Sequence, residues 1–131
     1  MRELMHTRRP TVAVAVLLLA ASTGCIAEPL SGPLGDPAHG ETVYQICMGC
    51  HSLDENDVGP MHRGVVGRAA GSIPNYAYSA ALKNSGLTWS ATNLDKWLTN
   101  PQALVPGAKM FFSLSNAQDR ADVIAYLSAQ R

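Results

Sequence analysis

Two cysteines and a histidine stand close together in the segment Ile-Cys-Met-Gly-Cys-His at residues 46–51. Cys47 and Cys50 are three residues apart, so both sulfur atoms point to the same side of a helical turn. Such a pair can form a redox-active disulfide, supply half of a zinc site, or attach a c-type haem when a histidine follows directly. The rest of the sequence discriminates among these three chemistries.

The surrounding sequence favours haem attachment. A zinc site would need two further ligands, but no cysteine follows Cys50, and His62 is the only histidine after His51. A thioredoxin-like disulfide should follow a strand, whereas the residues before Cys47 have a helical pattern. The motif therefore predicts that both cysteines bond to the vinyl groups of one porphyrin and that His51 faces the iron. A thiol oxidoreductase without haem is the alternative.

A second protein ligand on the iron would decide whether the haem carries electrons or binds small molecules. The candidate side chains are His39, His62, Met48, Met61 and Met110. Met48 lies within the attachment loop, and Met61 follows His51 too closely to reach the opposite face of the porphyrin. Met110 comes about 60 residues after His51, in a loop rich in proline and glycine that can cover that face. A methionine that fills a gap in the core is the alternative for Met110.

From Gly35 to the C-terminus the sequence resembles the class I cytochromes c, of the mitochondrial and bacterial cytochrome c2 branch. Seven segments occur in the order and at the spacing of that family: GDPAHGETVYQICMGCHSL, GPMHRGVVGR, YAYSAAL, LTWS, LDKWLTNP, VPGAKMFF and DVIAYL. The resemblance implies an all-α class I cytochrome c fold, in which helices and loops wrap around one covalently bound haem c. It also implies that Met110 is the second axial ligand, opposite His51.

The same resemblance implies further contacts around the haem. Pro60 corresponds to a residue whose carbonyl accepts a hydrogen bond from the axial histidine and so orients its ring. Arg68, Tyr78 and Trp89 correspond to residues that hydrogen-bond the haem propionates or offset their charge, which buried charges require. Tyr78 and Trp89 could equally be aromatic residues of an ordinary core.

Three residues depart from the family pattern. Trp97 stands where the family usually has a tyrosine near the methionine sulfur, so we expect the loss of a hydroxyl hydrogen bond and an altered iron potential. His62 lies in a stretch that is usually more apolar, and we expect it to be an exposed loop residue rather than a neighbour of the haem. Ala108 stands where the family often has a hydroxyl.

Local patterns predict four helices. Asp36 can cap a helix that begins at Pro37, and Gly40 marks its close crossing with another helix. A short helix within residues 78–86 should stop at Gly86. Ser90 can cap a third helix that ends before Pro101. Its apolar stripe is Leu94, Trp97 and Leu98.

The last helix has the strongest start signal, because Ser115 and Gln118 fit a capping box. Its predicted packing face comprises Ala121, Ile124, Ala125 and Ser128, widened by Val123 and Leu127. We expect this face to contact the first helix and the haem edge.

The first 24 residues have the pattern of an export signal, in which arginines precede an apolar run of about 11 residues, too short to span a bilayer as a standard helix. Cys25 follows Gly24 as in the lipobox of bacterial lipoproteins, so lipidation at Cys25 is favoured. Cleavage after Ala27 or an uncleaved anchor are the alternatives. We therefore expect a signal peptide at 1–24, a linker at 25–34 and a cytochrome c domain at 35–131, located in the periplasm.

The charge of the chain and the two expected protein ligands on the iron indicate the function. The chain has 10 Lys and Arg and 10 Asp and Glu, so no charge excess indicates nucleic-acid binding. From residue 26 onward 7 basic residues face 9 acidic ones, and the lysine ring of mitochondrial cytochromes c is absent. An iron held by His51 and Met110 has no vacant position. We expect a monomeric, non-enzymatic carrier of single electrons, and a haem-based sensor or weak peroxidase with a labile Met110 is the alternative.

The expected partners are membrane redox complexes. A quinol-oxidising complex would donate the electron, and a terminal oxidase or a photosynthetic centre would accept it. An N-terminal tether would keep the carrier near these complexes and replace long-range electrostatic steering by a high effective concentration.

Overall fold

The computed structural model describes residues 33–131. The expected signal peptide at 1–24, Cys25 and most of the linker at 25–34 lie outside the described residues. The helices of the described part are α1 (Pro37–Tyr44), the 3₁₀-helix η1 (Cys47–Gly49), α2 (Ala80–Lys83), α3 (Ala91–Thr99), α4 (Pro101–Leu104) and α5 (Ala117–Ala129).

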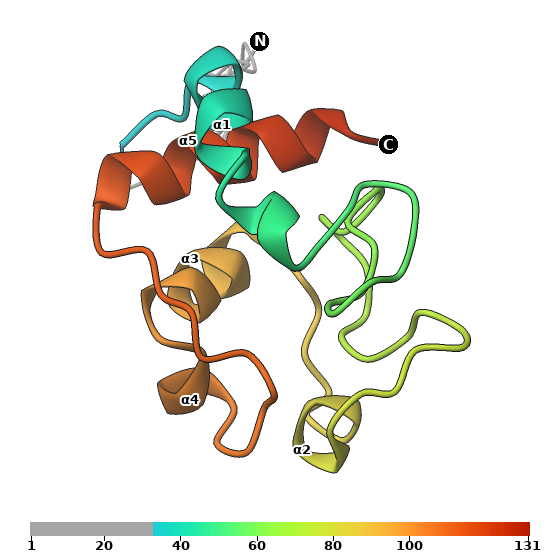
Figure 1. The fold of residues 1–131 in the computed structure, drawn as a ribbon. Helices are drawn as coiled ribbons and strands as arrows, with labels where there is room; N and C mark the ends of the chain where they lie inside the picture. Colours follow the sequence, from blue (N-terminus) through green and yellow to red (C-terminus); the bar gives the residue numbers. More distant parts are fainter. Residues whose placement is uncertain (1–32) are drawn as a thin grey trace, which may run out of the picture. The chain divides into compact units, whose positions relative to one another are not determined.

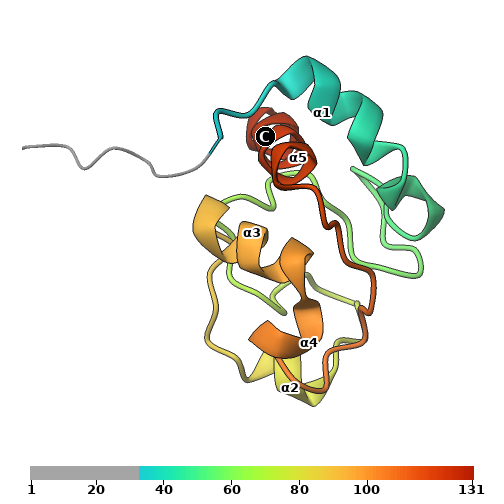
Figure 2. The same ribbon diagram turned by 90° about the vertical axis from the view of Figure 1, so that its left-hand side faces the viewer.

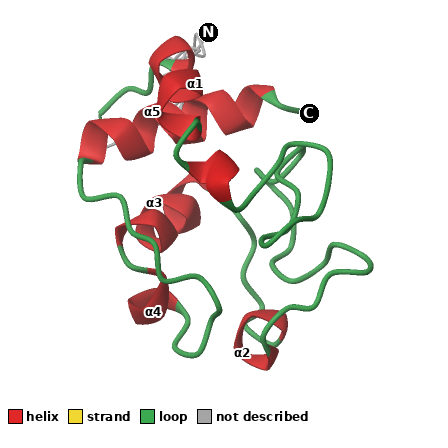
Figure 3. Ribbon diagram, viewed as in Figure 1, coloured by secondary structure: helices red, strands yellow, loops and turns green. Residues whose placement is uncertain are grey.

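Long loops connect these helices, above all between η1 and α2 (Figure 3). Within residues 33–131 the extended backbone amounts to one isolated antiparallel bridge between Ala69 and Thr88. The expected all-α architecture is confirmed. In the same range, no helix combines the length and the apolar character that a membrane crossing requires.

Helices α1 and α5 cross each other closely (Figures 1 and 2). As predicted, α1 begins at Pro37, and the Asp36 side chain accepts a hydrogen bond from the Ala38 backbone N–H at 2.9 Å. A Cβ atom at Gly40 would overlap the backbone carbonyl of Asp122 on α5. Only glycine allows the two backbones to come so near, which confirms the crossing predicted at Gly40.

The start of α5 differs from the prediction. The cap is Asn116, whose side chain accepts hydrogen bonds from the backbone N–H groups of Gln118 and Asp119, so the capping box at Ser115 is wrong. The residues that α5 buries are Asp122, Val123, Ile124 and Leu127. Three of the predicted face residues are therefore buried, whereas Ala121, Ala125 and Ser128 flank that face and are half-buried.

Helix α3 lies between α5 and α4 and agrees with its sequence pattern. The Ser90 side chain caps it by accepting a hydrogen bond from the Asn93 N–H at 3.1 Å, and the predicted stripe of Leu94, Trp97 and Leu98 is buried. Arg120 on α5 donates to Asp95 on α3 at 2.7 Å, which holds the two helices in register. The short helix α2 falls inside the predicted range and is capped by Ser79.

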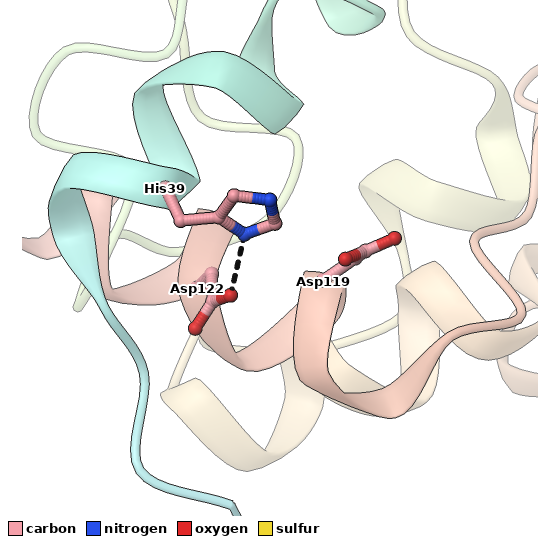
Figure 4. A group of neighbouring side chains, drawn as sticks. All are labelled: His39, Asp119 and Asp122. Atoms are coloured by element: carbon pink, nitrogen blue, oxygen red, sulfur yellow. Dashed lines mark hydrogen bonds and ion pairs between the residues drawn. The ribbon is translucent and has the colours of Figure 1, made fainter.

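A buried carboxylate ties the two crossing helices together (Figure 4). Oδ1 of Asp122 accepts hydrogen bonds from the Asp36 backbone N–H at 2.7 Å and from Gln118 at 2.8 Å. Its Oδ2 pairs with His39 Nδ1 at 2.7 Å. Asp119 lies beside this pair, and its carboxylate, the Asp122 carboxylate and the His39 ring come within 4.8 Å of one another. Because the Asp122 oxygens are already hydrogen-bonded, the cluster links helices rather than offering free ligand atoms.

This link makes stability depend on pH. The hydrogen bond to Asp122 raises the pKa of His39 above 6.5, so its contribution is complete below pH 6.5 and is lost as pH rises through the raised pKa. The hydrogen bond from the Asp36 N–H, followed by that from Gln118, lowers the pKa of Asp122 below 3.8. Its contribution is therefore present above pH 3.8 and is lost as pH falls through the lowered pKa.

We expect the His39→Gln variant to lose stability mainly in mildly acidic solution. Chemical denaturation at about pH 5.5 and about pH 8.5 should give a free-energy difference from the wild type that is larger at the lower pH. The neighbouring carboxylates of Asp36 and Asp119 act in the same direction as Asp122 on His39. An equal difference at both pH values would mean that folding does not raise the pKa of His39.

Candidate functional site

A cavity of about 320 Å³ lies among η1, α2, α3, α5 and the loops that connect them. Every site residue predicted from the sequence lines it: Cys47, Cys50, His51, Pro60, Arg68, Tyr78, Trp89 and Met110. Among the other candidate ligands, His62 also lines the cavity, whereas His39, Met48 and Met61 do not. One hollow thus brings together residues that are up to 63 positions apart in the sequence.

The helical turn η1 carries the two thiols. The backbone N–H groups of Cys50 and His51 both donate to the carbonyl of Cys47, at 3.0 and 2.9 Å, which forms the tight turn that three-residue spacing requires. Both cysteines are free, with Cys47 half-buried and Cys50 exposed. Burial raises the pKa of the Cys47 thiol. The pair therefore forms one wall of the cavity, with both thiols on one turn.

The imidazole of His51 is fixed by the loop that follows it. Its Nδ1 lies 2.8 Å from the carbonyl oxygen of Pro60, and since a carbonyl only accepts, Nδ1 carries the hydrogen. This tautomer leaves the lone pair on Nε2, the atom that binds a metal. A Cβ atom at Gly59 would overlap the ring, so only glycine fits there. Burial lowers the pKa of His51, against the opposing effect of the Pro60 carbonyl, and so favours the neutral, ligating form.

The sulfur of Met110 is held by an indole. Trp97 Nε1 donates a hydrogen bond to Met110 Sδ at 3.1 Å. The expectation that Trp97 removes a hydrogen bond from the sulfur is therefore wrong, because the indole N–H takes the place of a hydroxyl. Trp97 is itself buried in the core and packs edge-on against Trp89, with 5.1 Å between the ring centroids. The sulfur position is thus set by a rigid aromatic pair.

Gln102 on α4 shapes the loop of Met110. The sequence patterns did not predict this function. Its Nε2 donates to the carbonyls of Ala108 and Met110, both at 2.8 Å, and its Oε1 accepts from the Gly107 N–H at 3.2 Å. One amide side chain therefore closes the loop around Met110. The sequence signal that could have indicated helix α4 is the pair Asn100-Pro101, which ends α3 and also starts α4. The Asn100 side chain caps α4 by accepting a hydrogen bond from the Ala103 N–H.

We expect Gln102→Leu to loosen the Met110 loop without changing the fold. The change removes three hydrogen bonds worth about 1 kcal/mol each, so the loop should lose about 3 kcal/mol. That loss corresponds to a rise of about 150-fold in the rate at which added imidazole displaces Met110 from the ferric protein. The exposed Gln45 supplies the control variant Gln45→Leu, which should react at the wild-type rate. Equal rates for both variants would contradict this function of Gln102.

Arg68, Tyr78 and Trp89 add hydrogen-bond donors to the lining of the cavity. The Arg68 guanidinium donates to the carbonyls of Arg63 and Met61, at 3.0 and 2.7 Å, and burial lowers its pKa. Burial likewise raises the pKa of the Tyr78 hydroxyl, so the phenol stays protonated at neutral pH. A guanidinium, a phenol and an indole are all hydrogen-bond donors, which suits acidic groups on a ligand.

His62 was expected to be exposed, and that prediction is wrong. Its ring is stacked on His51, with 4.0 Å between the centroids and 19° between the planes, and it lines the cavity. Burial, followed by the effects of His51 and Arg68, lowers the pKa of His62 to about 3. The side chain is therefore neutral at physiological pH.

The donor set and the cavity suit a c-type haem. Two thiols and an imidazole on one wall could hold a porphyrin by its edge and its iron, and a thioether approaches from the Met110 loop. Leucine and valine side chains line much of the remainder: Leu82, Leu94, Leu98, Val123 and Leu127. A flat, apolar ring with two acidic substituents matches this combination of apolar walls and clustered donors.

Comparisons with known proteins agree with this interpretation. Residues 37–130 match the family model for cytochrome c. Cytochrome c2 of Rhodomicrobium vannielii is 54% identical over 100 residues, which cover 73% of this chain and 80% of that protein. Among solved structures, cytochrome cH from Methylobacterium extorquens is 47% identical with a TM-score of 0.70, over 72% of this chain and 98% of that one. Cytochrome c2 from Rhodospirillum centenum is 37% identical with a TM-score of 0.70, over 73% of this chain and 98% of that one.

Proposed function

This chain belongs to the cytochrome c family, carries one covalently attached haem c and is an electron carrier, and on that premise we propose how it holds the iron and where it works. Cys47 and Cys50 would form the thioether links to the haem, and the imidazole of His51 and the thioether of Met110 would bind its iron. When bound, the haem iron alternates between Fe(II) and Fe(III) and so holds or releases one electron.

The observation that carries this proposal is the hydrogen bond from Trp97 Nε1 to Met110 Sδ. A sulfur atom has more than one lone pair, so this bond fixes the direction of the side chain while leaving a lone pair for the iron. The Pro60 carbonyl orients His51 in a comparable way. Both ligands are thus held in advance, and the side chains need little rearrangement when an electron arrives or leaves.

The ligand types also set the direction of the redox potential. A thioether is a soft ligand that favours Fe(II), so Met110 raises the potential relative to a second imidazole. The Trp97 hydrogen bond withdraws electron density from the sulfur and acts in the same direction. Apolar walls around the site disfavour the additional positive charge of Fe(III).

Carbon monoxide tests whether a protein side chain occupies the sixth coordination position of the iron. We expect the spectrum of the reduced wild-type protein to stay unchanged under carbon monoxide, and the ferric protein to show the methionine-to-iron charge-transfer band. Rapid carbon monoxide binding together with the absence of that band would instead support a ligand-binding sensor or a weak peroxidase. The same spectra without any haem absorption would support the thiol oxidoreductase.

We further propose that redox partners dock on an apolar rim at the mouth of the cavity. The apolar rim consists of Ile46, Val58, Phe111 and Phe112, which line the cavity and are all exposed. Arg68 and Lys109 are the only arginine, lysine, aspartate or glutamate residues in the lining of the cavity. A surface of this kind suits a partner with a matching apolar patch, such as a quinol-oxidising complex, a terminal oxidase or a photosynthetic centre.

Ionic strength should therefore have little effect on partner reduction. We expect the rate with isolated membranes to vary much less than the roughly 10- to 1,000-fold range of electrostatically steered association. The measurement is stopped-flow reduction of the holoprotein by membranes at increasing salt. A steep fall of the rate with salt would indicate a charged docking surface.

The cellular location follows from the same proposal. A c-type cytochrome with an export signal at 1–24 and a linker at 25–34 would act in the periplasm as a monomer, with residues 35–131 as its redox domain. Lipidation at Cys25 or an uncleaved signal segment would hold that domain at the membrane. Intact mass of the protein purified from membrane and soluble fractions distinguishes these forms.

A further inference from the structure

His62 occupies a place that the electron-transfer mechanism leaves without a function. Its ring lies parallel to His51 inside the cavity, and its Nδ1 is 3.2 Å from the hydroxyl of Tyr44. Its backbone is also anchored, because the His62 N–H donates to the Ser52 carbonyl at 2.9 Å. The next residue, Arg63, donates to Leu53 at 2.8 Å. His62 is therefore held through its backbone and through the outer edge of its ring.

Tyr44 gives this arrangement a rigid base. It is only 2% exposed, lies at the end of α1 and packs against Tyr126 of α5, with 5.2 Å between the ring centroids. Three aromatic contacts thus run in series from the crossing of α1 and α5 to the ring of His51. A movement of His51 about its side-chain bonds would have to displace a ring that is connected to the helix crossing.

The two other contacts of His51 leave its plane incompletely defined. The hydrogen bond from Nδ1 to Pro60 fixes one edge of the ring, and Gly59 limits how the loop backbone approaches it. One hydrogen bond leaves the ring free to rotate about the N–H···O line, because the preferred directions at a carbonyl oxygen are broadly distributed. A parallel ring at stacking distance restricts that tilt.

We propose that His62 is a positioning residue that sets the plane of the His51 imidazole by stacking on it, with Tyr44 holding His62 in place. This inference rests on the proposed function of His51 as an axial ligand. The orientation of an axial imidazole determines how the unpaired electron of ferric haem is distributed over the porphyrin. His62 therefore controls an electronic property of the site without touching the iron.

The test uses ferric holoprotein and the hyperfine-shifted NMR signals of the haem methyl groups. His62→Leu removes the stacked ring, so the spread and order of the four methyl shifts should change. His62→Phe restores a ring of similar shape and should return the pattern toward that of the wild type. His39→Leu removes an imidazole that does not line the cavity, and it should leave the pattern unchanged.

Tyr44→Phe provides a second test if His62→Leu does not take up haem. It removes the hydroxyl that contacts His62 Nδ1 and keeps the packing, so the methyl shifts should move away from the wild-type pattern, whereas His39→Leu should leave them in place. Unchanged shifts in His62→Leu, or in Tyr44→Phe where the former does not fold, would overturn the inference. Failure of the proposed function is distinguishable, because the wild type itself would then lack the spectrum of a low-spin haem with histidine and methionine ligands.

Discussion

Met110→Ala protein should bind carbon monoxide in its reduced form, whereas the wild type should not. Alanine cannot reach the iron, so the sixth position opens to water or to added ligands. The ferric variant should also lose the methionine-to-iron charge-transfer band, and its redox potential should fall because the soft sulfur no longer stabilises Fe(II). Loss of the partly buried side chain should lower the free energy of unfolding by about 2 kcal/mol.

Met48→Ala and Met61→Ala are matched controls. Neither methionine lines the cavity, and Met48 is exposed on the attachment turn. Both variants should keep the charge-transfer band and remain inert to carbon monoxide. If Met110→Ala retained the band while either control lost it, another methionine would be the ligand and the interpretation of the Met110 loop would be wrong.

The second large effect is expected when both attachment cysteines are removed. The Cys47→Ala/Cys50→Ala variant should have the mass of the polypeptide alone after denaturation, whereas the wild type should be heavier by one haem. Each single variant should keep a single thioether link and show a shifted haem absorption. Without its covalent cofactor, the double variant should be strongly destabilised, because a domain of this size depends on such a staple.

Cys25→Ser separates attachment from the remaining cysteine. Cys25 lies outside the C-x-x-C-H motif, so the variant should carry the same haem mass as the wild type. The difference in intact mass between this variant and the wild type also reports whether the wild-type chain is lipidated at Cys25.

Covalent haem in the double variant Cys47→Ala/Cys50→Ala would contradict the assignment of these two cysteines as the attachment residues.

Local sequence rules predicted the elements whose signals are local. Asp36 followed by Pro37 fixes the start of α1, because a capping oxygen and a preset backbone angle act within one turn. The stripe on α3 follows from helical spacing alone. Gly40 was recognisable because a glycine inside a helix has few other reasons to be there.

The wrong predictions for α5 and His62 have different causes. Ser115 and Asn116 are adjacent and both are good caps, so the capping preference alone does not decide at which residue α5 begins. His62 reaches the cavity only because the chain at residues 62–63 pairs with residues 52–53. No sequence pattern near His62 predicts the pairing of residues 62–63 with residues 52–53.

The site itself was predictable to the level of its residues but not of its bonds. The C-x-x-C-H motif and the loop around Met110 identified the two cysteines, His51 and Met110, and the resemblance to the class I cytochromes c added Pro60, Arg68, Tyr78 and Trp89, all of which line one cavity. The bond from Trp97 to the sulfur could not be derived, because it depends on how far an indole extends compared with a phenol. Gln102 was missed because α4 is a single turn with no apolar period of its own.

X-ray absorption at the iron edge of the natively purified ferric protein tests the central claim most directly, since it reports the atoms bonded to the iron. Ligation by His51 and Met110 predicts five nitrogen neighbours and one sulfur, with the sulfur contribution lost in Met110→Ala. A wild-type spectrum with six nitrogen or oxygen neighbours and no sulfur would contradict it.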